Sequence, residues 1–440
     1  MTDEELRDVH PGRQGLGVGL ALGVTIPGIL VRLLHPEFAH PLEALIFGLS
    51  IVGAAFILSW AAEVAQLDIS AGLAIAVLAF IAVLPEYAVD FVLAYNGGQD
   101  FAEFGRECEP PGDPGESACS LALANMTGAN RLLIGIGWSL VVFVAYFRSR
   151  RTTRPLREIK LERSHTVEVS FLALATLYSL TLPLKSSITP IDAVVLVGIF
   201  IAYTIRISRA PAEEPHLVGP ARLIGTFTRS RRRLSVVLMF MFAGTVILLV
   251  AENFAEALVA TGREYGVNEF LLIQWLAPLA SEAPELLVAG LYAWRLNTNA
   301  GLGTLVSSKV NQWTLLVGTL PIVFSIGAGA LHGLPIDAHQ REELLLTAAQ
   351  SFFALAVLLT LSITTREALL LFTLFWAQFI IGALVPESLQ LAERVGVSAV
   401  YVLLGLTLFV RDRHLIVPLV RDGLVTPYKR LNAPAEMPGE

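Results

Sequence analysis

The chain has 440 residues, of which 54% are hydrophobic and only 16% are charged. A soluble globular protein has about a quarter of its residues charged, and the mean hydropathy here is +0.64. These values exclude a soluble domain and predict a polytopic membrane protein. The acidic, polar stretch 1–7 does not resemble a signal peptide, so we expect the first span to remain in the mature protein.

About 20 apolar residues cross a bilayer as a helix, and the chain contains twelve such runs. We predict spans at 15–34, 42–61, 69–95, 118–147, 167–184, 188–207, 234–260, 268–294, 300–331, 343–363, 366–385 and 395–411. The runs 118–147 and 300–331 are longer than one crossing needs, which predicts a tilt or a break in each.

Basic residues cluster in three places, at 148–163, at 206–233 and in the tail at 411–430. With twelve spans, all three clusters lie on one side, which the positive-inside rule assigns to the cytoplasm. We therefore predict an integral protein of the plasma (inner) membrane with both termini cytoplasmic. Because topology accounts for the basic clusters, we expect no nucleic-acid partner.

Two of the predicted spans carry a glutamate directly after a proline, Glu86 in the span 69–95 and Glu285 in the span 268–294. A charge at that depth costs about 3 kcal/mol or more and marks an ion or proton pathway. The proline also frees a carbonyl four residues earlier from its helical hydrogen bond. A bound cation would satisfy both groups.

Each of these spans is followed by a segment of small residues, at 124–130 and at 303–309. Corresponding elements lie five spans apart, and an odd offset inverts the second copy in the membrane. The sequence therefore predicts an all-α protein of about twelve transmembrane helices with two inverted-topology repeats of five helices, which is typical of secondary transporters.

The same pattern predicts the domain boundaries. They are a cytoplasmic N-terminus at 1–14, a first transmembrane half at 15–207 with its repeat core at 57–140, a basic cytoplasmic linker at 208–233, a second half at 234–411 with its core at 247–320, and a cytoplasmic tail at 412–440.

Two buried carboxylates surrounded by carbonyl and hydroxyl oxygens suit a hard divalent cation such as Ca²⁺. Protons would compete for the same carboxylates when the cation leaves, which is a route to antiport. The alternative reading of each motif is a prolyl kink whose glutamate bonds to a neighbouring helix. Three further glutamates near span ends are typical of vestibule or snorkelling positions: Glu63, Glu252 and Glu256.

Other polar residues share these helix faces. Asp90 lies one turn after Glu86, and Glu282 lies one turn before Glu285. In the small-residue segments, packing and ligand roles both remain open for four polar residues: Asn125, Asn130, Ser307 and Ser308. Lys309 either pairs with Glu282 or Glu285 as a built-in positive charge or snorkels to the interface.

The two cysteines, Cys108 and Cys119, lie in the Gly-, Pro- and acid-rich region after the third predicted span. A disulfide is expected if this region faces an oxidising compartment, and two unpaired thiols fit the sequence equally well. The absence of a nearby histidine in the sequence argues against zinc.

The duplicated, inverted Pro-Glu motifs resemble the α-repeats of the cation/Ca²⁺ exchanger superfamily, whose pattern is Gly-Thr-Ser-x-Pro-Glu and then Gly-Asn-x-x-Gly-Ser-Asn-x-x-Asn/Asp. The resemblance covers 57–140 and 247–320. It implies a sodium/calcium exchanger-like fold in which Glu86 and Glu285 bind Ca²⁺. The metal-binding residues it implies, with their neighbours, are Glu86, Glu285, Ser281, Glu282, Ser308 and Gln312, and the accessory positions are Asp90, Asn125, Asn130 and Lys309.

The first repeat departs from the family pattern, because Ala82-Val83 replaces the Thr-Ser pair and Leu133 replaces the late Asn/Asp ligand. The lost groups resemble those that hold Na⁺ in sodium-coupled members. The counter-ion is therefore open between H⁺ and Na⁺, with a slight preference for H⁺.

We interpret the chain as a secondary active antiporter that exchanges Ca²⁺ or a related cation for H⁺ or Na⁺ by alternating access. Its expected partners are membrane lipid and the transported cations, without a cofactor, and the sequence leaves its oligomeric state open. The alternative is a divergent protein of the same fold that is transport-inactive or differently selective. The chain contains no His-Glu-x-x-His or Gly-x-Ser-x-Gly motif, which argues against an intramembrane enzyme.

Overall fold

The computed structural model describes residues 10–36, 38–68, 84–110, 116–150, 155–210 and 217–431. Ten helices within these residues are long and apolar enough to cross a membrane. The remaining two predicted spans carry the Pro-Glu motifs, and both contain a long helix, α5 (Leu84–Phe104) and α12 (Glu269–Trp294). The predicted all-α polytopic fold is confirmed, although the stretch 69–83 lies outside the described residues.

The other membrane helices are α2 (Pro11–Leu34), α3 (His40–Ala65), α6 (Ala118–Leu132), α7 (Ser139–Ser149), α8 (Thr166–Ser179), α9 (Pro190–Ile207), α11 (Arg229–Tyr265), α13 (Thr298–Asn311), α14 (Val317–Gly327), α15 (Ala338–Val357), α16 (Thr365–Leu384) and α17 (Glu387–Arg411). Short helices are α10 (Pro220–Gly225), α18 (Arg413–Leu424) and α19 (Tyr428–Leu431). Capping boxes start α9, α15 and α16. In each, the N-cap side chain accepts a hydrogen bond from the backbone N–H three residues later, and the side chain of that later residue accepts one from the N-cap backbone N–H.

A π-helical turn interrupts each of the two overlong runs. One, Leu133–Trp138, joins α6 to α7, and the other, Gln312–Leu316, joins α13 to α14. The sequence predicts a tilt or a break in each of the runs 118–147 and 300–331, and in the structure each is one continuous helix that contains a π-helical turn. Such turns are frequent at functional sites. They start three residues after Asn130 and three residues after Lys309, so the two repeats deviate from α-helix at equivalent positions.

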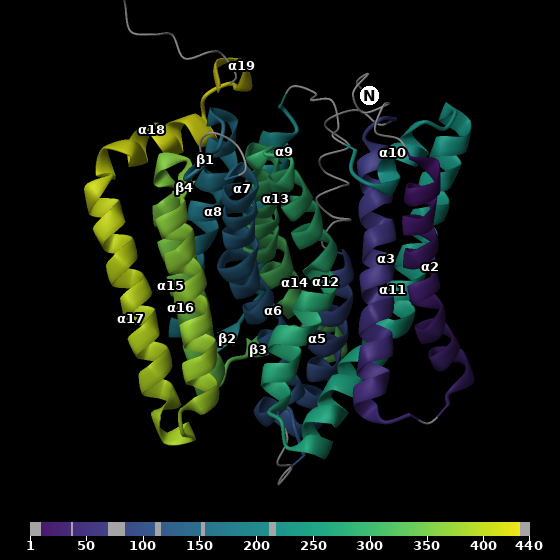
Figure 1. Ribbon diagram of the computed structural model, residues 1–440. Helices are drawn as coiled ribbons and strands as arrows, with labels where there is room; N and C mark the ends of the chain where they lie inside the picture. Colours follow the sequence, from purple (N-terminus) through teal and green to yellow (C-terminus); the bar gives the residue numbers. More distant parts are fainter. Residues whose placement is uncertain are drawn as a thin grey trace, which may run out of the picture.

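The two halves pack across each other rather than side by side. Helix α6 of the first half packs on α12 of the second, and α14 of the second half packs on α5 of the first. Two short antiparallel strand pairs also join the two halves. β1 (Glu158–Lys160) pairs with β4 (Ser362–Thr364), and β2 (Ser187–Ile188) pairs with β3 (Leu334–Pro335). The pairs lie toward opposite ends of the bundle (Figure 1).

Helices α2, α3 and α11 form a group at one side of the molecule (Figure 1). An ion pair just beyond the membrane joins two of them, because Arg232 of α11 donates to both carboxylate oxygens of Asp68 at 2.7 and 2.9 Å. The Arg232 bond lowers the pKa of Asp68. The ion pair therefore stabilises the folded protein at pH values above the ordinary pKa of an Asp side chain. This stabilisation is lost as the pH falls through the lowered pKa of Asp68.

The start of α2, the linker helix α10 and the C-terminal helices α18 and α19 lie at the same end of the bundle (Figure 1). The basic segments follow α7, contain α10 and include α18, so they share that end, as the charge pattern predicts. At the opposite end, Cys108 and Cys119 form a disulfide with Cα atoms 5.9 Å apart, which decides between the two readings of these cysteines.

Close backbone contact explains one residue in the small-residue segments. A Cβ atom on Gly128 of α6 would lie 1.7 Å from the carbonyl oxygen of Gln274 of α12. The equivalent crossing of α5 and α14 has the same requirement, since a Cβ on Gly98 would lie 2.2 Å from the carbonyl oxygen of Phe324. Small residues thus allow the two halves to interlock.

We predict that Gly128→Ala destabilises the protein by about 1–3 kcal/mol, because α6 and α12 must move apart. Thermal melting in detergent measures the effect. The matched control is Gly290→Ala, where the added Cβ would meet only Leu140 Cδ2 at 3.8 Å and where removing a helical glycine stabilises by up to about 1 kcal/mol. Equal melting temperatures for the two variants would contradict the prediction.

Candidate functional site

The two Pro-Glu glutamates differ in their exposure. Glu86 is in the first turn of α5 and is only 4% exposed, whereas Glu285 is half-buried in the middle of α12. Their carboxylates interact electrostatically with each other, although they belong to opposite repeats. The role of the two glutamates as a shared cation site stays a prediction.

Predicted neighbours in the second repeat bind the acidic residues directly. The hydroxyl of Ser308 donates a 2.6 Å hydrogen bond to Glu285 Oε2, and Gln312 Nε2 donates a 2.5 Å bond to Glu282 Oε1. Ser281 instead donates to the carbonyl oxygens of Ala277 and Pro278 within its own helix. Ser308 and Gln312 thus bind two different acids of α12, and the hydrogen bonds that Ser281 donates go to neither of them.

Accessory residues extend the cluster in the first repeat. Asn125 donates a 2.7 Å hydrogen bond to Asp90, and the carboxylate of Asp90 interacts electrostatically with Glu86. Asn130 donates to the carbonyl oxygen of Met126 at 2.9 Å. The two asparagines are therefore bound within the cluster, one to an acid and one to backbone.

Several buried oxygen atoms around this cluster lack a hydrogen-bond donor among the described residues. They are Glu86 Oε1, Asp90 Oδ2, Asn125 Oδ1, Glu282 Oε2 and Gln312 Oε1. Each unsatisfied buried polar atom costs about 1–3 kcal/mol. All are acceptors, which is the deficit that a cation relieves and a hydrogen-bonding anion does not.

Lys309 is completely buried, at 0% exposure, so its snorkelling interpretation is wrong. Its ammonium donates 2.6 Å hydrogen bonds to both the backbone oxygen and Oδ1 of Asn130, the equivalent position in the other repeat. It also interacts electrostatically with Glu282 and Glu86. Lys309 therefore lies inside the acidic cluster and binds Asn130, whereas neither Glu282 nor Glu285, both among the described residues, forms an ion pair with it.

Within the described residues, no three His, Cys, Asp or Glu side chains group closely enough to hold a metal ion by themselves. The cluster instead mixes carboxylates with amide and hydroxyl groups and contains the side chain of Lys309. Binding of a divalent ion here therefore has to use neutral oxygens as well as Glu86 and Glu285.

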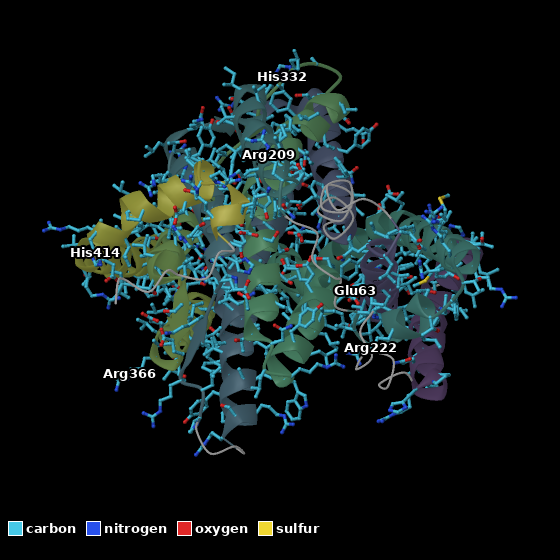
Figure 2. The ribbon with its side chains drawn as sticks, turned by 90° about the horizontal axis from the view of Figure 1, so that it is seen from above. Glu63, Arg209, Arg222, His332, Arg366 and His414 are labelled. Atoms are coloured by element: carbon cyan, nitrogen blue, oxygen red, sulfur yellow. A yellow bond between two sulfur atoms is a disulfide. The ribbon has the colours of Figure 1, made fainter. Side chains whose placement is uncertain are left out.

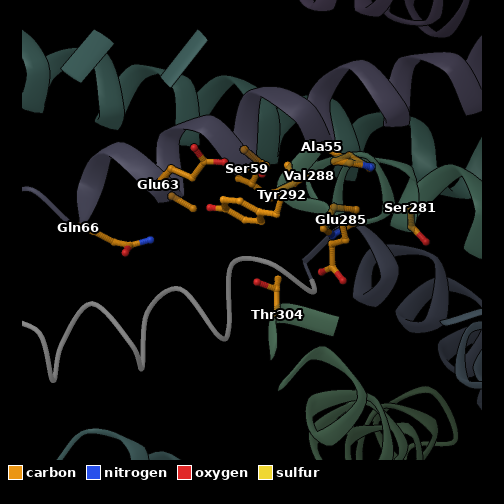
Figure 3. Close-up of a pocket in the computed structure, with 13 residues that line it drawn as sticks. Ala55, Ser59, Glu63, Gln66, Ser281, Glu285, Val288, Tyr292 and Thr304 are labelled. Carbon is orange, nitrogen blue, oxygen red and sulfur yellow. The ribbon is translucent and has the colours of Figure 1, made fainter. Parts of the chain in front are cut away.

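A cavity of about 220 Å³ leads to the cluster (Figure 3). Ser281 and Glu285 line its inner part, and Glu63 and Gln66 line it near the end of α3, at the basic end of the bundle. Glu63 accepts a 2.7 Å hydrogen bond from the backbone N–H of Val218, just before α10. A vestibule position, one of the two expected for Glu63, agrees with this placement.

The structure contains a second buried polar network that the sequence did not predict. Arg131, 1% exposed, lies 2.6 Å from Glu343 Oε2, and Arg394 lies 2.8 Å from Glu343 Oε1. Gln274 of α12 donates to Glu343 at 3.0 Å and to Thr127 at 3.2 Å. The network joins α6, α12, α15 and α17. The signal was available, because Arg131 interrupts an apolar run as Glu86 does.

We predict that Glu343→Gln destabilises the protein by about 3–5 kcal/mol, because it leaves the buried Arg131 without its negative partner. The control Glu342→Gln removes only the 2.9 Å contact to Arg394 and should destabilise less, because Arg394 keeps Glu343 as a partner at 2.8 Å. Thermal melting of both variants in detergent checks the difference. A Glu343→Gln variant as stable as the control would refute this assignment.

Two cross-packed halves that each deliver a broken helix and a buried acid to a shared central site define an inverted-repeat secondary transporter. The family model described as sodium/calcium exchanger protein matches residues 42–208 and 235–410. The chain belongs to the sodium/calcium exchanger protein family, and the resemblance stated from the sequence is confirmed. Membership makes it a cation antiporter rather than a member of a catalytic enzyme class.

Solved structures agree. A crystal structure of the H⁺/Ca²⁺ exchanger CAX is 42% identical, with a TM-score of 0.84, covering 95% of this chain and 98% of that one. A crystal structure of the Ca²⁺/H⁺ antiporter protein YfkE is 14% identical, with a TM-score of 0.56, covering 88% of this chain and 99% of that one, and shares the fold. A search of curated proteins finds no match.

Proposed function

We propose that the protein exchanges Ca²⁺ for H⁺ by alternating access at the Glu86–Glu285 site. The observation that carries the proposal is the group of buried oxygens without donors among the described residues, which includes atoms of Glu86, Glu282 and Gln312 and therefore comes from both repeats. The similarity to the H⁺/Ca²⁺ exchanger CAX supports the choice of both ions.

Calcium fits the donor chemistry of the site. Ca²⁺ takes six to eight oxygen ligands in flexible geometry, and the site combines the two carboxylates with the Ser308 hydroxyl and the amide oxygen of Gln312. Two negative charges also match a divalent ion. Ser281 and Glu282 complete the proposed ligand set, and Asp90, Asn125 and Asn130 support it from the first repeat.

Protons fit the other half of the cycle. When Ca²⁺ leaves, carboxylates held together in a low-dielectric interior cannot all stay charged, so protons are the simplest replacement. Lys309 adds to this argument, because its side-chain nitrogen already occupies space among these acids, where it is bonded to Asn130. A monovalent metal ion would have to share that space with the ammonium.

The access path follows from the cavity. It joins the site to the end of the bundle that carries the basic segments, and the positive-inside rule makes that end cytoplasmic in a plasma (inner) membrane. Alternating access requires the group of α2, α3 and α11 to shift against the rest so that the opposite path opens. The linker 208–233 joins the proposed halves 15–207 and 234–411, and it contacts the cavity mouth through Val218 and Glu63.

We predict that Glu285→Gln abolishes Ca²⁺ counter-transport without loss of expression, because one of the two charges that balance Ca²⁺ is removed. Uptake of ⁴⁵Ca²⁺ into reconstituted vesicles is measured under an imposed pH gradient and then under a Na⁺ gradient. Glu252→Gln, an exposed position on α11, is the matched control and should keep native uptake.

The same assay separates the alternatives. Uptake that is driven only by the pH gradient supports H⁺ as the counter-ion. Uptake that is driven by the Na⁺ gradient identifies Na⁺ as the counter-ion. Flux that needs neither gradient, or native uptake by Glu285→Gln, would overturn the proposed mechanism.

For Lys309, we predict that Lys309→Gln lowers the KM for Ca²⁺ at least about tenfold, because removing a nearby positive charge strengthens cation binding at a buried site. It should also make Ca²⁺ uptake sensitive to competing Na⁺. Lys309→Arg keeps the charge and serves as the control. Equal KM values and equal Na⁺ sensitivity in the two variants would show that the charge of Lys309 does not select the ion.

A further inference from the structure

A second cavity, of about 380 Å³, lies away from the transport site, where the end of α9 meets the corner between α18 and α19. Its lining residues are Arg206, Arg209, Val425, Pro427, Tyr428 and Lys429. Three of the six are basic and none is acidic. Arg209 lies close to the C-terminal helices in the end-on view (Figure 2).

Arg206 is fixed in the wall of this cavity. Its guanidinium lies 4.8 Å from the centre of the Tyr428 ring and donates hydrogen bonds to the carbonyl oxygens of Gly423, at 2.9 Å, and Asp422, at 3.3 Å. These neutral partners hold the group in place without cancelling its charge. The nearby carboxylate of Asp422 is paired with Arg163 at 2.7 Å.

The other two basic residues are available to a ligand. Arg209 and Lys429 are exposed, and in the described part of the chain neither has an ion-pair partner. The cavity thus combines one ordered guanidinium with two unpaired cations, an arrangement that suits a phosphate group.

The helix beside the cavity has the character of a membrane-surface helix. α18 crosses the end of the bundle at a steep angle to α17 (Figure 1). Leu419 points into the protein at 6% exposure, whereas Val417 is 74% exposed and Val425, which lines the cavity, is 73% exposed. Basic residues Arg413 and Arg421 flank this apolar surface. Helices of this kind lie in the interface between head groups and acyl chains.

We propose that this cavity binds the head group of an anionic phospholipid, with Arg206, Arg209 and Lys429 around the phosphate and an acyl chain against Val425 and α18. A lipid fits better than a soluble phosphate, because an exposed valine in the wall and an adjacent interfacial helix give an acyl chain a surface. Basic cavities at this membrane level are known to suit anionic lipids. The site is separate from ion exchange and would hold even if the proposed counter-ion were wrong.

The test uses the full-length protein in zwitterionic detergent, titrated with phosphatidylglycerol and, separately, with phosphatidylcholine. Thermal melting and native mass spectrometry report binding. We expect phosphatidylglycerol to stabilise the protein, and the double variant Arg209→Gln/Lys429→Gln to weaken this binding at least about tenfold. The control Arg157→Gln/Lys160→Gln removes two exposed charges from the same end of the bundle and should bind as the native protein does.

Two further arms identify the ligand. Inorganic phosphate at the same concentration should stabilise little, and Val425→Thr should weaken phosphatidylglycerol binding while leaving any phosphate effect unchanged. The proposal fails if the double variant binds phosphatidylglycerol as tightly as its control. It also fails if inorganic phosphate or phosphatidylcholine stabilises the protein as well as phosphatidylglycerol does.

Discussion

The structure depends on how the negative charge of several buried acidic side chains is compensated. Glu86, Glu282 and Asp90 are all at most 4% exposed, and Glu285 is close to them. Such a group of acids is tolerated only with positive charge or hydrogen-bond donors around it. Lys309 lies among these acids and binds Asn130, Ser308 and Gln312 supply donors to Glu285 and Glu282, and the remaining deficit is what a transported cation or protons would satisfy. In the proposed mechanism, transport and the stability of the core therefore share one electrostatic requirement.

The inverted duplication supplies the geometry for this cluster. Helices of opposite halves interlock in two pairs, α6 on α12 and α14 on α5, and glycines at 128 and 98 allow the backbones to approach. The π turns after Asn130 and Lys309 start at equivalent positions, so each repeat shifts its helical register at the site. The bond between Lys309 and Asn130 then joins two equivalent positions that have diverged in chemistry.

Much of the fold and part of the site could be predicted, because the bilayer restricts what a membrane chain can do. Apolar run lengths predict the helices, and a buried acid such as Glu86 is conspicuous where charge is costly. The interaction partners of buried charged side chains were harder to predict. The sequence left Lys309 between pairing and snorkelling, since both depend on which helix faces it. It also gave no partner for Arg131, because Glu343 lies 212 residues later in the chain and only packing of α15 against α6 brings them together.

By itself, the sequence determined the class of protein, the repeat, the two Pro-Glu acids and the common side of the basic segments. These features follow from local composition and spacing, because apolar runs form membrane-spanning helices and basic residues set the orientation of those helices. Only the tertiary structure decided the disulfide between Cys108 and Cys119, the burial of Lys309, the Arg131–Glu343 network and the end of the bundle from which the cavity reaches Glu285. Each of these depends on contacts between helices distant in sequence, and a one-dimensional pattern carries no information about which side chains such packing brings within hydrogen-bond distance.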